Sequence, residues 1–461
     1  MHIPNFENYT DTFVNNVYNL ANAQFDKEVY EHFRYCFLDY VGCTFAGSRF
    51  LSLKVNEIIN TGIFPKGESH IIGNPTKLNI SGAAFINAIC SHVIELDDGH
   101  KLGAFHPAAP IFSGLLAVAE YERISYGDFI RGAIVGYEAA LRLASAIQPY
   151  HRNRGFHTTG TCGAIGVAMA VSAALHFNKK EIKSALAAAV SCSSGVNEMM
   201  NGNSQLKPFN AGKAAYDGVM TAYIGKVNFL PPDDVIGGKR GFFAVMTDKF
   251  DDSYIRYFDT SSLLGMTNYF KLYAACRHCH AAIEATLKIC KENLIIPKDI
   301  EKINIGMYES GISGHEHQFV DSVNSAKMSI PYCVAVSIID KNAGIGEFDK
   351  THIDREDIKT LSHKVFIYEE PSLTALIPQK RGSIVEIITK SSTYVKRVDS
   401  SKGDKENPMT SKELISKFYE LVQYSGVEIN ETKRACDAIL NSKPDISIPE
   451  LLQEICQSQI N

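Results

Sequence analysis

Small residues dominate a series of helix-forming segments in the first 265 residues of the chain. Apolar residues recur there at helical spacing over residues 6–22, 27–46, 83–93, 110–122, 127–148, 163–177, 181–193 and 210–226. Several of these segments carry Ala and Gly on more than one face, which suits helices that pack closely at the centre of a bundle. The pattern predicts a large helical domain over residues 1–265.

The pattern changes after about residue 266. Residues 300–307, 363–370 and 383–398 alternate and are rich in Val, Ile, Tyr and Thr, which predicts strands. Helices are expected from about Tyr273 and over 329–340. These elements predict a smaller α+β domain over residues 266–400.

A polar connection at 400–408 leads into a last helical segment. Thr410 and Glu413 have the spacing of a capping box, which predicts a helix start there. We expect residues 401–461 to return to the first domain. The predicted fold is therefore mainly α, with an all-helical domain built from both chain ends and an inserted α+β lid.

Composition excludes several classes of protein. Of the 461 residues 45% are hydrophobic and 21% are charged, and the net charge of −5 provides no basic field for nucleic acid. The longest apolar runs fall short of the ~18 residues that a membrane span needs. The first residues lack the basic and apolar regions of an export signal. The 11 scattered cysteines then read as reduced thiols, so we expect a cytoplasmic protein that binds neither membranes nor nucleic acid.

Residues 95–107 are the first candidate for chemistry. Glu95, Asp97 and Asp98 crowd into four positions, and His106 follows shortly afterwards. Such crowding suits the end of a helix opening into a loop, where acid–base groups are often placed. The alternative interpretation is a solvated acidic turn with a structural histidine.

Four further islands follow along the chain. They span residues 155–163, 207–215, 271–285 and 329–335. In this order, the five islands resemble the MmgE/PrpD family, which includes 2-methylcitrate dehydratases, cis-aconitate decarboxylases and iminodisuccinate epimerases. The resemblance covers nearly the whole chain, including the late segment 403–418.

The resemblance implies a set of site residues. Those expected at the catalytic site are His106, His157, His280, Tyr332, Glu95 and Asp98. It also implies a homodimer, a site between the two domains and chemistry without a cofactor. The substrate class it implies is a small polycarboxylate.

Basic side chains provide the expected substrate contacts. Lys207 precedes Pro208, so we expect an extended backbone there, before a helix that starts near Gly212. Lys271, Arg277 and His278 lie close together in an acidic chain, and a guanidinium can hold a carboxylate by two contacts. A surface lysine and a basic helix end are the alternative interpretations.

Three motifs that suggest cofactors are better explained otherwise. Residues 160–166 read Gly-x-x-Gly-x-x-Gly with no strand before them, which favours close helix packing over a dinucleotide loop. Residues 276–280 read Cys-x-x-Cys-His, but neither an export route for haem attachment nor a second cysteine pair for zinc exists. The histidines of residues 315–317 are too close for a zincin motif. We therefore expect no metal and no cofactor.

Three functions remain open. The leading hypothesis is a cofactor-independent lyase, either a dehydratase or a decarboxylase, that acts next to a carboxylate. An epimerase of the iminodisuccinate type and a non-catalytic carboxylate-binding protein are the alternatives. Asp98-Gly99-His100 replaces the Asp-Thr-Trp of the dehydratases, and residues 276–280 also depart from their pattern. These departures argue against 2-methylcitrate. The loop also looks one residue longer than in the animal decarboxylases, whose threonine falls on Gly99, which argues against cis-aconitate. The loop looks closer to epimerase-like and unassigned bacterial branches.

Overall fold

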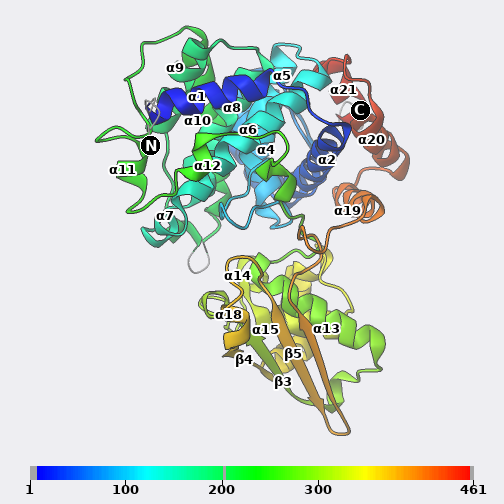
Figure 1. Ribbon diagram of the computed structural model, residues 1–461. Helices are drawn as coiled ribbons and strands as arrows, with labels where there is room; N and C mark the ends of the chain where they lie inside the picture. Colours follow the sequence, from blue (N-terminus) through cyan, green and yellow to red (C-terminus); the bar gives the residue numbers. More distant parts are fainter. Residues whose placement is uncertain (1–7, 201–203, 457–461) are drawn as a thin grey trace. The chain divides into compact units, whose positions relative to one another are not determined.

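The computed structural model describes residues 8–200 and 204–456, and the chain is mainly helical, as predicted. It divides into two compact units (Figure 1). The helical unit comprises Met1–Met199, Leu206–Asn268 and Thr410–Asn461, and the α+β unit comprises Met200–Gln205 and Tyr269–Met409. The predicted helix 6–22 and the predicted closing segment 401–461 each include residues outside the described ones, such as Phe6 and Asn461.

The predicted helices of the first 265 residues are present in the helical unit. Its first helices are α1 (Tyr9–Ala21), α2 (Lys27–Phe50), α3 (Ser52–Asn60), α4 (Ile80–Val93), α5 (Ala108–Tyr121), α6 (Tyr126–Ile147) and α7 (Tyr150–Asn153). They are followed by α8 (Thr158–Ala174), α9 (Lys179–Ser191), α10 (Lys207–Lys226), α11 (Phe242–Met246) and α12 (Ser253–Arg256). The chain end adds α19 (Ser411–Tyr424), α20 (Ile429–Asn441) and α21 (Ile448–Cys456), and the predicted capping box closes the start of α19.

Helix α8 lies at the centre of this unit, and each of its residues is buried. It packs against α5, α6, α9 and α10 (Figure 1). A Cβ at Gly163 would lie 2.9 Å from Cβ of Ala214, and one at Gly136 of α6 would lie 2.6 Å from the carbonyl oxygen of Gly166. The glycine motif at 160–166 therefore permits close helix packing, as predicted.

The expectation of an all-helical domain is wrong in one place. Strands β1 (Lys66–Ile71) and β2 (Asn74–Leu78) form an antiparallel hairpin in the helical unit, with Gly73 at positive φ in its turn. Pro75 lies inside β2 and weakens the strand signal of the sequence. Both strands of a two-stranded sheet are edges, so the proline is tolerated there.

The α+β unit is built on one sheet. The strands β3 (Ile300–Met307), β4 (Val365–Glu369), β5 (Ser383–Thr389) and β6 (Thr393–Val398) occur in the spatial order β4-β3-β5-β6. β3 and β4 are parallel, whereas β5 pairs antiparallel with both β3 and β6. The predicted strand 300–307 matches β3, and the predicted strand 383–398 is a hairpin.

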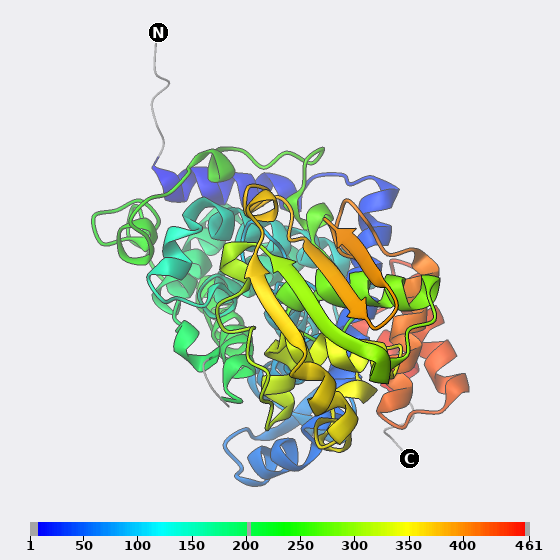
Figure 2. The ribbon, with the colours of Figure 1, turned by 90° about the horizontal axis from the view of Figure 1, so that it is seen from below.

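Helices α13 (His280–Glu292) and α15 (Ile330–Ile339) cover one face of this sheet. The unit also contains the short helices α14 (Val323–Met328), α16 (Lys350–Ile353), α17 (Glu356–Ser362) and α18 (Pro371–Thr374). α13 packs against β5 and β6, and α15 packs against α13 and β4. Figure 2 looks onto the other face of the sheet. Phe366 and Tyr368 are exposed, whereas Ile305 and Val385 are buried. The helix expected from about Tyr273 begins later, as a 3₁₀ turn at Arg277–Cys279 that leads into α13.

Among the described residues, the helices are all too short or too polar to cross a bilayer.

Candidate active site

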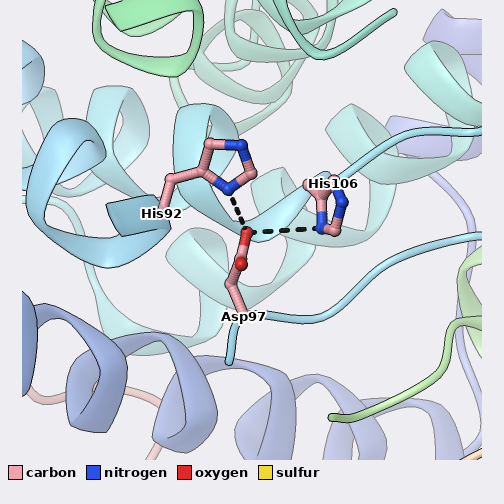
Figure 3. A group of neighbouring side chains, drawn as sticks. All are labelled: His92, Asp97 and His106. Carbon is pink, nitrogen blue, oxygen red and sulfur yellow. Dashed lines mark hydrogen bonds and ion pairs between the residues drawn. The ribbon is translucent and has the colours of Figure 1, made fainter. Parts of the chain in front are cut away.

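Two histidines converge on one carboxylate in the helical unit (Figure 3). His92 lies in the last turn of α4, and Asp97 and His106 lie in the loop that follows. Oδ2 of Asp97 is 2.7 Å from Nδ1 of His92 and 3.5 Å from Nδ1 of His106. His92 and Asp97 are fully buried, whereas 16% of the His106 side chain is exposed. The predicted acid-rich loop is therefore a buried turn that presents His106, and it is not a solvated surface loop.

Backbone contacts fix the proton on the His106 ring. Nδ1 of His106 lies 2.7 Å from the carbonyl oxygen of Asp98. A carbonyl oxygen only accepts hydrogen bonds, so Nδ1 must carry the proton when the ring is neutral. The lone pair is then on Nε2, which makes this atom a base. The loop is closed by a backbone pairing of His100 with Phe105, immediately before His106.

His157 has the opposite tautomer from His106. It precedes α8, and its Nδ1 lies 3.0 Å from Nδ2 of Asn210 on α10. Because the amide nitrogen is a donor, Nδ1 accepts and the ring proton is on Nε2. Burial, and then the positive charge of Lys207, hold the pKa of His157 well below its usual range. His157 is therefore a neutral hydrogen-bond donor, with its ring 6.3 Å from that of His92.

Lys207 is the cation of this group. It is the first residue of α10, and its Nζ forms an ion pair with Glu95, a residue at positive φ. The expected extended backbone and helix start near Gly212 are wrong. Pro208 occupies the first helical turn, where a missing N–H is tolerated because these amides have no partner within the helix.

The side chain of Asp98 contacts the surrounding helical unit, whereas Glu95 pairs with Lys207. The buried carboxylate of Asp98 accepts hydrogen bonds from the backbone N–H of Ala108, the side chain of Asn268 and the hydroxyl of Tyr137. Burial raises the pKa of Asp98 to about 7, although the hydrogen bonds from Asn268 and Ala108 oppose the shift. The side chain of Asp98 thus anchors the loop, and its carbonyl oxygen orients His106.

The α+β unit holds the second group of predicted residues. Nη1 of Arg277 lies 2.9 Å from Nδ1 of His280, so the predicted proximity of these residues is confirmed. Nη2 of Arg277 forms an ion pair of 2.6 Å with Asp404, and the guanidinium lies over the ring of Tyr269. Nε2 of His280 lies 3.2 Å from the carbonyl oxygen of Ala275. Both ring nitrogens of the buried His280 are therefore engaged within the unit.

The remaining predicted residues of this unit are buried as well. His278 contacts the hydroxyl of Tyr308 through Nδ1, and Lys271 is 1% exposed. The hydroxyl of Tyr332 donates to the carbonyl oxygen of Glu347 over 2.7 Å, and burial raises its pKa. Tyr332 thus has the contacts of a core tyrosine, which was the alternative to an active-site role.

Three residues of these groups were missed from sequence: His92, Asn210 and Asp404. Asp97 was part of the acidic run that marked the loop as a candidate, but it was not named among the expected catalytic residues. Asn210 and Asp404 lie 53 and 127 positions from their partners, so spacing gave no indication of them.

The His92–Asp97–His106 group also has the composition of a metal site. Its three ligand atoms lie within 4.8 Å of one another, although no sequence motif predicted a metal here. With Nδ1 donating to the carbonyl oxygen of Asp98, the lone pair that neutral His106 could offer a metal is on Nε2, and a backbone contact of this kind also orients metal-binding histidines. The contacts of Asp97 show an aspartate shared between two imidazoles.

Comparison with known proteins identifies the family. The MmgE/PrpD N-terminal domain matches residues 11–255, and the MmgE/PrpD C-terminal domain matches residues 273–442. The chain belongs to the MmgE/PrpD family, as its motifs predicted. It is also similar to a cis-aconitate decarboxylase from Homo sapiens, with 24% identity over 427 residues, which are 89% of this chain and 86% of that protein. These matches support an enzyme of the MmgE/PrpD type.

Proposed function

We propose that this protein is a cofactor-independent lyase that acts on a small polycarboxylate by proton transfer next to a carboxylate group. The observation that carries the proposal is the His106 tautomer, which leaves Nε2 as a base in a loop beside His157 and the Lys207–Glu95 pair. The family and its decarboxylase member support a reaction of the dehydratase or decarboxylase kind.

Each group has a chemical role in this proposal. Lys207 binds a substrate carboxylate by a charge-assisted hydrogen bond. Nε2 of His106 removes a proton from the adjacent carbon, and the electron pair moves into an enediolate. The Nε2–H of neutral His157 donates to the negative charge that develops. In a decarboxylation, CO₂ leaves first and its bonding pair stays on the substrate, so His106 must enter the step protonated and give the proton on Nε2 to the carbon.

A substrate panel followed by NMR in D₂O tests the proposal. Methylcitrate, citrate, cis-aconitate and iminodisuccinate are offered, and CO₂ release is measured in parallel. An unsaturated product without CO₂ identifies a dehydratase, and CO₂ with deuterium in the product identifies a decarboxylase. Exchange with inversion and no unsaturated product would overturn the lyase in favour of an epimerase. Binding of an acid with neither exchange nor CO₂ would favour a non-catalytic carboxylate-binding protein.

We also propose that the protein is a cytoplasmic homodimer. The apolar side chains of Phe209 and Met220 on α10 are 43% and 42% exposed, which gives a surface suited to a second copy. Light scattering after size-exclusion chromatography tests this proposal. A monomer at micromolar concentration would contradict it.

A further inference from the structure

A cysteine and a histidine outside the groups described above lie in contact in the α+β unit. Sγ of Cys276 is 3.2 Å from Nε2 of His315, and Nδ1 of His315 is 3.2 Å from the carbonyl oxygen of Ser313. The carbonyl oxygen only accepts, so the neutral ring carries its proton on Nδ1 and presents the Nε2 lone pair to the thiol. In this tautomer, Nε2 of the imidazole can take the proton of the cysteine thiol.

Backbone hydrogen bonds hold both residues in place. The N–H of Cys276 donates to the carbonyl oxygen of Lys327 over 2.8 Å, and the N–H of Ile330 donates to the carbonyl oxygen of His315 over 2.9 Å. Both residues are partly exposed, as a site that reacts with a small reagent requires.

The charges around the pair favour a thiolate at Cys276. Cys276 directly precedes the turn that leads into α13, so it lies near the positive end of that helix. The ring of His278 lies 4.9 Å from that of His315. The charge of Arg277, the next residue in the chain, is paired with Asp404. Burial opposes protonation of His315, but Cys276, Cys279 and the carbonyl oxygen of Ser313 together outweigh it and raise the pKa of His315 to about 9.

Cys279, three residues later, provides a contrast. Its thiol is fully buried, and burial raises its pKa well above the usual range. The Cys-x-x-Cys-His sequence therefore contains one thiol placed to ionise and one placed to stay protonated.

We propose that Cys276 and His315 form a thiolate–imidazolium pair and that Cys276 is a modification site for soft carbon electrophiles. With a haloacetamide, sulfur forms the S–C bond and halide leaves with the bonding pair. With an activated alkene, sulfur attacks one alkene carbon, the π pair moves to the other, and that carbon takes the proton from His315. No oxidant is needed, and the site is independent of the proposed lyase activity.

The test is the alkylation rate of each cysteine in the full chain. The protein is treated with limiting iodoacetamide, quenched and digested, and the labelled peptides are quantified by mass spectrometry. Cys192 and Cys290, the other partly exposed thiols, are the internal references. An ordinary thiol is only a few per cent ionised at pH 7, so a thiolate at Cys276 gains in reactivity. Part of this gain is lost because a thiolate of low pKa is intrinsically less nucleophilic. We therefore expect Cys276 to react about tenfold faster than Cys192 and Cys290.

Variants and pH separate the pair from simple exposure. His315→Gln should lower the Cys276 rate about tenfold at pH 7 and leave Cys192 unchanged. The matched control is His317→Gln, which removes a histidine of the same segment that contacts Ser325 and should leave the Cys276 rate unchanged. In the unmodified chain, the Cys276 rate should stay nearly constant from pH 6 to pH 8 while the Cys192 rate rises. A Cys276 rate that rises in parallel with Cys192, or that is unaffected by His315→Gln, overturns the proposal.

Discussion

Nδ1 of His106 lies 2.7 Å from the carbonyl oxygen of Asp98. The backbone of the acid-rich loop therefore sets the tautomer of its own histidine, while the Asp98 side chain holds the loop against Ala108 and Asn268. The choice of Nε2 as the basic nitrogen of His106 thus depends on the folded backbone of the loop more than on a single partner side chain.

Removal of the His106 imidazole should abolish most of the activity. We expect His106→Ala to lower kcat by ~10²–10⁴-fold, the usual contribution of a general acid–base group. The matched control is His176→Ala, whose side chain is 64% exposed. Steady-state kinetics and thermal unfolding are measured on both variants. A His106→Ala enzyme within twofold of the parent would exclude His106 as the base.

His157 should act through its N–H and not through proton transfer. Its pKa lies well below the usual range, because burial and Lys207 disfavour the charged ring. Glutamine can keep a hydrogen-bond donor at this place, so His157→Gln should retain more kcat than His157→Phe. Equal loss in both variants would contradict a donor role.

The same shift predicts how stability depends on pH. Below pH 6.5 the unfolded state binds a proton at His157 that the folded state does not bind, so acid favours unfolding. This contribution to the free energy of unfolding is present above pH 6.5 and is lost by at most ~1.4 kcal/mol per pH unit as the pH falls. His157→Gln removes this pH-dependent contribution. The difference in unfolding free energy between the parent and the variant should therefore become smaller from pH 7.5 to pH 5 in denaturant titrations. A gap that stays constant would show that His157 titrates normally in the folded protein.

Lys207 should affect substrate binding more than turnover. Lys207→Met removes a charge-assisted contact to a carboxylate, so we expect KM to rise by the equivalent of ~1.5–3 kcal/mol. The change also leaves Glu95 buried without its cation, and the double variant Lys207→Met/Glu95→Gln corrects this. The control Lys213→Met alters a lysine of the same helix that pairs with Asp217. Recovery of KM in the double variant would mean that Lys207 acts only by neutralising Glu95.

The physical reasons for success and failure from sequence are visible in particular residues. β3 was predicted because its apolar residues alternate, and α8 because its small residues recur at helical spacing. The hairpin β1–β2 was missed because Pro75 interrupts a short strand. His106 and His157 were indicated by motif order, whereas Asp404, a buried partner of Arg277, depends on tertiary contact and leaves no local pattern.

The Arg277–Asp404 pair should stabilise the α+β unit. Both side chains are buried, so Arg277→Ala leaves an uncompensated charge and should cost roughly 3–5 kcal/mol of unfolding free energy. Arg355→Ala is the control within the same unit, because Arg355 is 31% exposed in its pair with Asp340, and exposed pairs contribute ~1 kcal/mol or less. Chemical denaturation measures both. Equal losses of unfolding free energy in the two variants would show that burial of the Arg277–Asp404 pair does not increase its contribution to stability.

The aspartate shared by His92 and His106 leads to a prediction about metals. We expect activity to survive EDTA, because the proposed mechanism uses the Nε2 lone pair of His106 as a base, and a resident ion would occupy that lone pair. Added Zn²⁺ should instead inhibit, since the three residues offer ligand atoms within 4.8 Å of one another, and an ion on Nε2 of His106 would occupy the lone pair of the proposed base. Asp97→Asn should weaken that inhibition by removing the carboxylate ligand, whereas Asp217→Asn on α10, which pairs with Lys213, should leave it unchanged. Activity that is lost with EDTA and restored by one equivalent of metal would overturn the cofactor-independent mechanism, and it would make these three residues a metal centre.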